Sequence, residues 1–193
     1  MAKRLVTGFK ERLRKFGASE SGVAAVEFAL CAPPFLLMLG VIIETGLMMF
    51  TEYALQSAVQ DASRVIRTGQ ASAATMTAAQ FKTKICATAS VIIDCTGGVT
   101  VYVRSDKDFA TLQSNLPSFL NIGPSVGVQP AGPTCYNIGQ PIQPAAVVAT
   151  YDWYFSMLGM SFLGNIASNS ARRLVGFAIF RNEPYPGSGG TAC

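Results

Sequence analysis

Apolar residues dominate the chain from Val23 to Phe50 and then recur with a helical period. No charged residue occurs between Phe28 and Ile43. A membrane-spanning helix needs about 20 mostly apolar residues, so Val23 to Met49 is long enough to cross a bilayer. Spacings of three and four residues then predict one face of a continuing helix. That face consists of Leu47, Phe50, Ala54, Ala58, Ala62 and Val65.

The two helical patterns are joined without a break, which predicts one rod of about 45 residues. Gly69 is expected to end this helix, because glycine adopts the left-handed conformation that commonly terminates helices. Pro33 and Pro34 are expected to kink its apolar part. Residues 70–77 are predicted to be a linker.

Shorter patterns follow the rod. Thr77 and Gln80 have the spacing of a capping box, which predicts a short helix over residues 78–92. Residues 97–105 alternate apolar and polar side chains, as a strand with one buried face does. Two further segments, 144–155 and 171–182, also read as strands.

These elements predict an α+β fold. It has a long N-terminal helix, whose first half is transmembrane, followed by a small periplasmic head with a short helix and a three- to four-stranded antiparallel sheet. A loop rich in proline and glycine, residues 117–144, connects the first two strands. The predicted divisions are a basic leader (1–22), the transmembrane and amphipathic helix (23–69) and the head (70–193).

Charge is concentrated before the apolar run. The whole chain has a net charge of +4, and the first 22 residues account for all of it. Nucleic-acid binders usually carry basic residues on the folded domain, so nucleic acid is not an expected partner. Positive residues favour the cytoplasmic side, which predicts a single-pass protein of the inner membrane with a cytoplasmic N-terminus. A cleaved secretory signal is the competing interpretation, but its apolar region is usually shorter.

Five cysteines suit an exported domain. Cys31 lies inside the apolar run, which leaves four cysteines in the head. Cys86 and Cys95 are the most economical pair because they close a short loop, and Cys135 with Cys193 follows by elimination. A zinc site is disfavoured, because the sequence has no C-x-x-C spacing and no histidine.

Enzymatic function is not expected. The absence of histidine removes histidine-based acid–base chemistry and triads. Asp106 and Asp108 are a candidate pair of catalytic carboxylates, but a solvated turn explains the two residues better. The sequence contains neither a phosphate-binding loop nor a dinucleotide-binding glycine pattern, and we expect no cofactor.

Residues 151–170 form the most unusual exported segment, with aromatic and methionine side chains between two strands. Two interpretations are equally open. The segment can fold under the sheet as core, or it can form an exposed apolar lip that contacts the bilayer or another subunit.

A carboxylate near the start of an apolar helix calls for an explanation, because a lone charge in lipid is costly. Gly22, Glu27 and Phe28 have the form G-x-x-x-x-E-[FY] at the junction of the leader and the helix. This pattern resembles the processing site of type IV prepilins. The resemblance implies cleavage after Gly22 and a new N-terminus at Val23. Otherwise, Glu27 simply extends to the lipid headgroups beside Glu20.

The likeness extends along most of residues 15–186 and is weakest over 105–144. The segment GVAAVEFALCAPPFLLMLGVIIETGLMMFTEYALQSAVQDASRVIRTG resembles the TadE-like family, the pseudopilins of the tight-adherence (Flp) pilus system. FKTKICATASVIIDC is similar to the family's cysteine-bearing helix, and FRNEPY to its closing strand. Cys31 and Pro34 depart from the family pattern.

The resemblance implies a structural subunit that acts in pilus assembly. Its partners would be a prepilin peptidase, pilin and other pseudopilin subunits, and the lipid bilayer. Glu27 and Glu44 would serve in assembly. The competing interpretation is an unprocessed, membrane-anchored periplasmic adaptor or binding protein.

Overall fold

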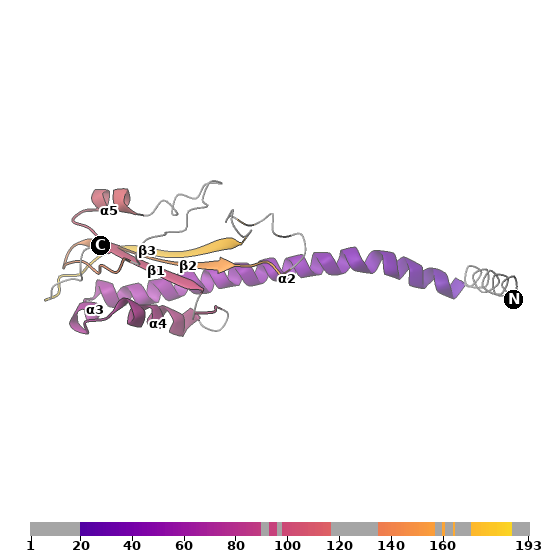
Figure 1. The fold of residues 1–193 in the computed structure, drawn as a ribbon, viewed down its shortest axis with the longest axis horizontal. Coiled ribbons are helices and arrows are strands. Elements are labelled where there is room, and N and C mark those ends of the chain that lie inside the picture. Colours follow the sequence, from indigo (N-terminus) through magenta and orange to yellow (C-terminus); the bar gives the residue numbers. More distant parts are fainter. Residues whose placement is uncertain are drawn as a thin grey trace, which may run out of the picture. The chain divides into compact units, whose positions relative to one another are not determined.

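The computed structural model of the protein describes residues 20–89, 93–95, 98–116, 135–156, 160, 164 and 171–186. It divides into two compact units, Met1–Ile43 and Glu44–Cys193, and each is described by itself. The elements in chain order are α2 (Glu20–Arg67), α3 (Gln70–Ala73), α4 (Ala78–Ala89), β1 (Val99–Ser105), α5 (Phe109–Asn115), β2 (Pro144–Trp153) and β3 (Arg172–Arg181) (Figure 1). A long apolar helix followed by a small α+β domain confirms the predicted fold class.

Helix α2 has 48 residues and continues through Pro33 and Pro34. The helix ends at Arg67, two residues before Gly69, as predicted. The backbone of Gly69 is left-handed, with φ of 76°, and its N–H donates to the carbonyl oxygen of Ile66 at 3.0 Å. A Cβ at Gly69 would lie 2.3 Å from the ring of Tyr185, so the position excludes any side chain.

The buried face of α2 differs from the predicted one at its beginning. Leu47 and Phe50 are exposed, so the prediction was wrong for these two residues. Met48 and Thr51 are buried instead. A buried threonine is tolerated here because its hydroxyl donates to the carbonyl oxygen of Leu47 at 2.7 Å. Further along, the predicted burial of Ala58, Ala62 and Val65 is confirmed.

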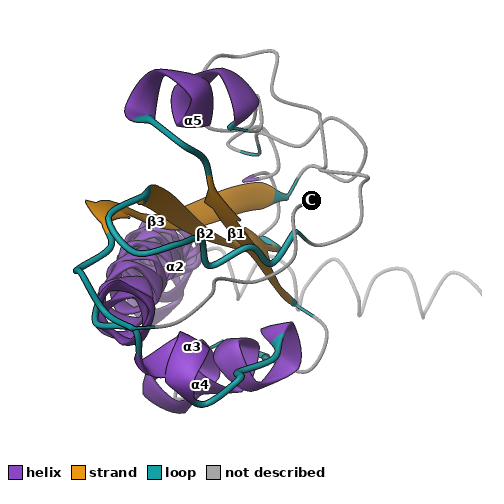
Figure 2. Ribbon diagram, turned by 90° about the vertical axis from the view of Figure 1, so that its left-hand side faces the viewer, coloured by secondary structure: helices purple, strands orange, loops and turns teal. Residues whose placement is uncertain are grey.

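The three predicted strands form one antiparallel sheet in the order β1-β2-β3. Central strand β2 pairs Val147 with Val103 of β1 and with Ala178 of β3. In the second unit, α2 and α4 cover one face of the sheet and α5 lies over the other (Figure 2). Both faces of β2 are therefore covered, which explains why Pro144 to Thr150 are all buried.

The hydrophobic core lies between the sheet and the two larger helices. Fully buried side chains from α2, α4 and the strands include Leu55, Val59, Ile66, Phe81, Ile85, Val103, Val147 and Leu174. Gly176 of β3 lets α2 approach closely, since a Cβ there would lie 3.0 Å from the carbonyl oxygen of Leu55. The second half of α2 is therefore an integral part of the head.

Backbone N–H and C=O groups on the two edge strands, β1 and β3, form hydrogen bonds with groups outside the sheet. The Gln56 side chain accepts from the N–H of Phe177 and donates to its carbonyl oxygen, both at 2.9 Å, as a neighbouring strand would. On β1, the N–H of Val103 donates to the carbonyl oxygen of Cys135 at 2.8 Å. The carbonyl oxygen of Val103 accepts from the N–H of Asn137 at 2.9 Å. Such partners reduce the tendency of an edge to pair with other chains.

The short helices partly match the prediction. Thr77 and Gln80 form the predicted capping box, with the Thr77 N–H donating to Gln80 Oε1 at 2.9 Å and the Gln80 N–H donating to Thr77 Oγ1 at 3.3 Å. Helix α4 then runs to Ala89. The expectation of a plain linker before it was wrong, because residues 70–73 form the single turn α3.

Helix α5 was not predicted. Asp108 caps its N-terminus by accepting from the N–H of Thr111 at 2.7 Å, and this bond lowers the pKa of the carboxyl. Asp106 instead accepts from Arg104 Nε at 2.9 Å, and the bond raises the pKa of the guanidinium. The two acids therefore have separate hydrogen-bond partners.

Candidate processing and assembly site

The predicted processing site occupies the first turns of α2. Gly22 is partly exposed, and Val23, Glu27 and Phe28 are exposed. Val23 and Glu27 are four positions apart in a helix, so their side chains share one face. The segment therefore presents an exposed Val23 and an exposed Glu27 carboxylate. The leader before it, residues 1–19, lies outside the described part of the chain.

The same helix is the candidate membrane anchor. Among the described residues, one helix is long and apolar enough to cross a membrane, Gly22–Arg67. Its most apolar window has a mean hydropathy of 2.2 and is not buried at all. Exposed aliphatic and aromatic side chains surround it from Val23 to Ile43, which is the pattern of a helix whose solvent is lipid.

Glu44 has a different environment from Glu27. It belongs to the second unit, it is 6% exposed, and its Oε1 accepts from the backbone N–H of Ser156 at 2.5 Å. Glu44 therefore holds the connection that follows β2 against the beginning of the head. Ser156 could not be predicted as the partner of Glu44, because a backbone amide distant in sequence leaves no residue-type signal.

The described residues of the segment 151–170 include both buried and exposed side chains. Trp153 and Phe155 pack against the core and Met160 is buried, as a core segment would be. Tyr154, by contrast, is 63% exposed. Residues 157–159, 161–163 and 165–170 lie outside the described part of the chain.

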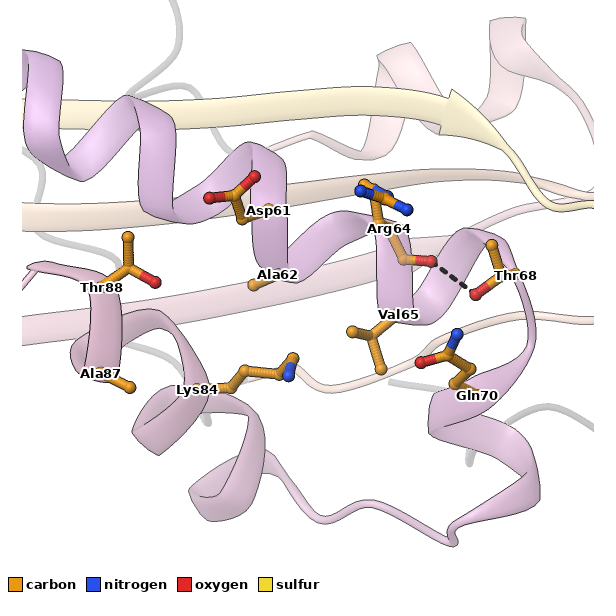
Figure 3. Close-up of a pocket in the computed structure, with 9 residues that line it drawn as sticks. All are labelled: Asp61, Ala62, Arg64, Val65, Thr68, Gln70, Lys84, Ala87 and Thr88. Carbon is orange, nitrogen blue, oxygen red and sulfur yellow. Dashed lines mark hydrogen bonds between the residues drawn. The ribbon is translucent and has the colours of Figure 1, made fainter.

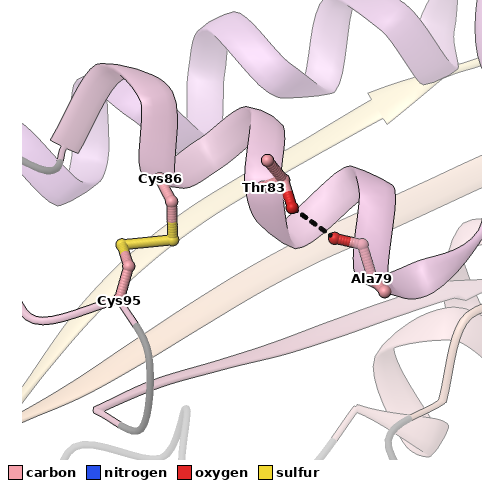
Figure 4. Close-up of a disulfide and its surroundings, with 4 residues drawn as sticks. All are labelled: Ala79, Thr83, Cys86 and Cys95. Atoms are coloured by element: carbon pink, nitrogen blue, oxygen red, sulfur yellow. Dashed lines mark hydrogen bonds between the residues drawn. A yellow bond between two sulfur atoms is a disulfide. The ribbon is translucent and has the colours of Figure 1, made fainter.

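The cysteines of the head stabilise the end of α4. Cys86 and Cys95 form the predicted disulfide, with their Cα atoms 5.8 Å apart (Figure 4). It links the last turns of α4 to the segment that leads into β1. Cys135 is buried beside Val103, and its proposed partner Cys193 lies outside the described residues, so that pairing stays a prediction.

A polar groove of about 310 Å³ lies between α2 and α4 in the described part of the head (Figure 3). Asp61, Arg64 and Lys84 are its charged lining residues, and the hydroxyl of Thr68 donates to the carbonyl oxygen of Arg64 at 2.8 Å. The lining offers a single carboxylate. Across the described residues, no group of three or more histidine, cysteine, aspartate or glutamate side chains could hold a metal ion.

The fold is that of a class of proteins in which an N-terminal helix, here a candidate membrane anchor, continues into a small α+β domain. In this chain the domain also contains a disulfide. Within that class, residues 22–64 match the family model described as TadE-like protein. The match covers the processing segment, the apolar span and most of the buried stripe of α2. It indicates a protein related to the Tad pilus. No curated protein and no solved structure matches the chain.

Proposed function

We propose that the chain is a pseudopilin-like structural subunit that acts in assembly of the tight-adherence pilus, after a prepilin peptidase cleaves it behind Gly22. The observation that carries this proposal is the G-x-x-x-x-E-[FY] pattern at Gly22–Phe28, at the start of a helix that matches the TadE-like family. The subunit has no catalytic turnover and needs no cofactor.

Cleavage creates the chemistry that assembly needs. It leaves an ammonium group on Val23 one helical turn from the Glu27 carboxylate. A charged group in the apolar part of a bilayer costs several kcal/mol unless it is paired. The carboxylate of one subunit pairs with the N-terminal ammonium of a neighbour and fixes the register between them. Exposure of both residues in the single chain supports a role between subunits.

The orientation follows from the leader and the disulfide. Basic residues before the span keep the N-terminus in the cytoplasm, and the head is exported to the periplasm. The Cys86–Cys95 bond supports this assignment, since disulfides persist in oxidising compartments. The direct partners are the prepilin peptidase, pilin and other pseudopilin subunits, and the bilayer.

Processing is tested by mass spectrometry of the protein extracted from membranes of cells that contain the peptidase. The mature chain is expected to begin at Val23. Gly22→Leu is expected to keep its leader, because a bulky side chain replaces the small residue before the cleaved bond. Gly17→Leu, a glycine within the leader that no acid follows at the same spacing, is the matched control and is expected to mature normally.

A wild-type chain that retains its leader, or a Gly22→Leu variant that matures to the wild-type mass, would show that the motif has been misread. The first result would favour an unprocessed membrane-anchored adaptor, whose working surface is the head.

A further inference from the structure

Strand β3 forms one edge of the sheet and lies beside the second half of α2 (Figure 2). A groove of about 480 Å³ separates the two elements within the head. One face of α2 lines it on one side, and consecutive residues of β3 line it on the other. The lining residues are Gln56, Gln60, Ser63, Arg64 and Arg67 on α2, and Phe177, Ala178, Ile179 and Phe180 on β3. The proposed assembly role does not use this groove.

Gln56 shows which kind of group the edge of β3 accepts. Its side-chain amide accepts from the N–H of Phe177 and donates to the carbonyl oxygen of the same residue. A side-chain amide has the same donor and acceptor as a peptide unit, so Gln56 fills one position that a neighbouring strand would occupy. The edge therefore has the backbone geometry that pairing with a further strand requires.

The edge is open beyond this position. In an antiparallel ladder, alternate residues point their backbone N–H and C=O groups away from the partner strand. Phe177 points outward in this way, so Ile179 and Arg181 do too. Among the described residues, no group forms a hydrogen bond with the outward backbone groups of Ile179 and Arg181. The open stretch, residues 178–181, is roughly 13 Å long at about 3.3 Å per residue.

The helix side of the groove is basic. Two of the lining residues are arginines and none is acidic. Arg67 Nε donates to Glu183 Oε1 at 3.2 Å, and the backbone N–H of Glu183 donates to the carbonyl oxygen of Arg67, so these residues close one end of the groove. Arg64 is exposed and takes part in none of the ion pairs of the described residues. An unpaired guanidinium beside an open strand edge favours a carboxylate.

The two faces of β3 differ in what they offer an added strand. Ala178 and Phe180 pack toward the core, on the side of α2. Phe177 and Ile179 alternate with them, point to the opposite face, and are 49% and 50% exposed. Side chains of an added strand would alternate in the same way. One set would face the arginine side of the groove, and the other would pack beside the exposed apolar side chains.

We infer that the edge of β3 binds an extended segment of a partner protein by strand addition. Acidic side chains of that segment face Arg64, and the apolar side chains between them pack beside Ile179. Backbone hydrogen bonds to residues 178–181 hold the segment in place. The inference goes beyond the proposed function and does not depend on cleavage behind Gly22.

Charge disfavours two other occupants of the groove. A second copy paired through the same edge would bring the arginines of two grooves together, and like charges oppose such an interface. The head also has two long segments outside the described residues, 117–134 and 187–193. Neither contains an acidic side chain, so neither matches the basic side of the groove.

Binding of synthetic peptides to the full-length protein in detergent tests the inference. The probe is a fluorescent peptide of about six residues, a typical strand length, in which glutamate alternates with valine. A matched peptide has lysine in place of glutamate, and a third has the glutamate sequence with N-methylated backbone amides. Fluorescence anisotropy is expected to show that wild type binds the glutamate probe at least about tenfold more tightly than either control, and that salt weakens this binding.

Substitutions in the groove locate the binding. Ile179→Pro removes an outward N–H and leaves the bonds to β2 in place, so we expect about tenfold weaker binding of the glutamate probe. Ile179→Val keeps the N–H and is the matched control, which should bind as wild type does. Arg64→Glu is expected to weaken binding of the glutamate probe about tenfold and to strengthen binding of the lysine peptide. Should Ile179→Pro not fold, the N-methylated peptide tests strand pairing on the wild-type protein.

Several results would overturn the inference. One is the absence of glutamate-probe binding at about 1 mM peptide. Equal binding of the N-methylated peptide would exclude strand addition, and equal binding of the lysine peptide would exclude recognition of acidic side chains. A dimer of wild type that Ile179→Pro abolishes and Ile179→Val keeps would make a second copy the occupant. Each of these results leaves the proposed function intact, since processing is read separately from the mass of the mature chain.

Discussion

Helix α2 contains two regions of similar secondary structure and opposite surroundings. From Val23 to Ile43, apolar side chains point in all directions and none is buried. From Glu44 to Arg67, one stripe is buried under the sheet and the other face is largely polar beyond Tyr53. A helix that is apolar all round requires an apolar solvent, whereas a striped helix requires a folded partner. The change near Glu44 therefore separates the candidate membrane anchor from the part that the folded head covers.

A core substitution should distinguish the two regions most strongly. Leu55 is fully buried against the sheet, and Leu37 is exposed on the span. Leu55→Ala is expected to destabilise the head by about 3 kcal/mol, because it removes buried methyl groups and leaves a cavity. Leu37→Ala is the matched control and should leave the head's stability unchanged.

The measurement is thermal unfolding of the detergent-solubilised protein, followed by the fluorescence of Trp153, which packs against the core. Equal destabilisation by both substitutions would mean that the division of α2 into two regions is wrong.

The cysteines offer a second test of the same division. Replacing both Cys86 and Cys95 by serine is expected to destabilise the head by about 2–3 kcal/mol, since the bond closes a short loop in the unfolded chain. Cys31 is an exposed free thiol on the span, so Cys31→Ser should not change the unfolding temperature. Non-reducing peptide mapping of the exported protein checks the bond directly, and two free thiols at residues 86 and 95 would contradict it.

Glu44 and Glu27 test the difference between the two regions of α2 at single residues. Glu44→Ala is expected to destabilise the head by about 1–3 kcal/mol, because the N–H of Ser156 loses its charged acceptor in a part-buried hydrogen bond. Glu44→Gln should recover part of that loss, since its amide oxygen can still accept. Glu27→Gln should have no effect on unfolding of the head. A Glu44→Ala head as stable as wild type would show that the contact contributes nothing.

Local patterns predicted much of this fold. The capping box at Thr77 and Gln80 and the alternation around Val101 depend on neighbouring residues, so they could be read directly. Helix α5 was missed because its only signal is the Asp108 cap, without an apolar run behind it. The burial of Thr51 in place of Phe50 depends on how α2 faces the sheet, which spacing alone does not determine.

The candidate site divides in the same way. Gly22 and Glu27 could be identified from the sequence because recognition by a peptidase depends on a short linear motif. The environment of Glu44 could not be predicted from the sequence, since its hydrogen-bond partner is a backbone N–H 112 positions away. Tyr154 lay within a segment whose two interpretations the sequence left open, and exposure of this one side chain required the folded head.

The central claim is that Glu27 acts between subunits and not within the head. It is tested most directly by expressing Glu27→Ala in a strain that lacks the native copy, confirming membrane levels by blotting and counting surface pili. Glu52→Ala, an exposed acid on the same helix within the head, is the matched control. The account predicts that Glu27→Ala loses pili at normal protein level while Glu52→Ala keeps them. Normal piliation by Glu27→Ala at normal protein level would contradict it.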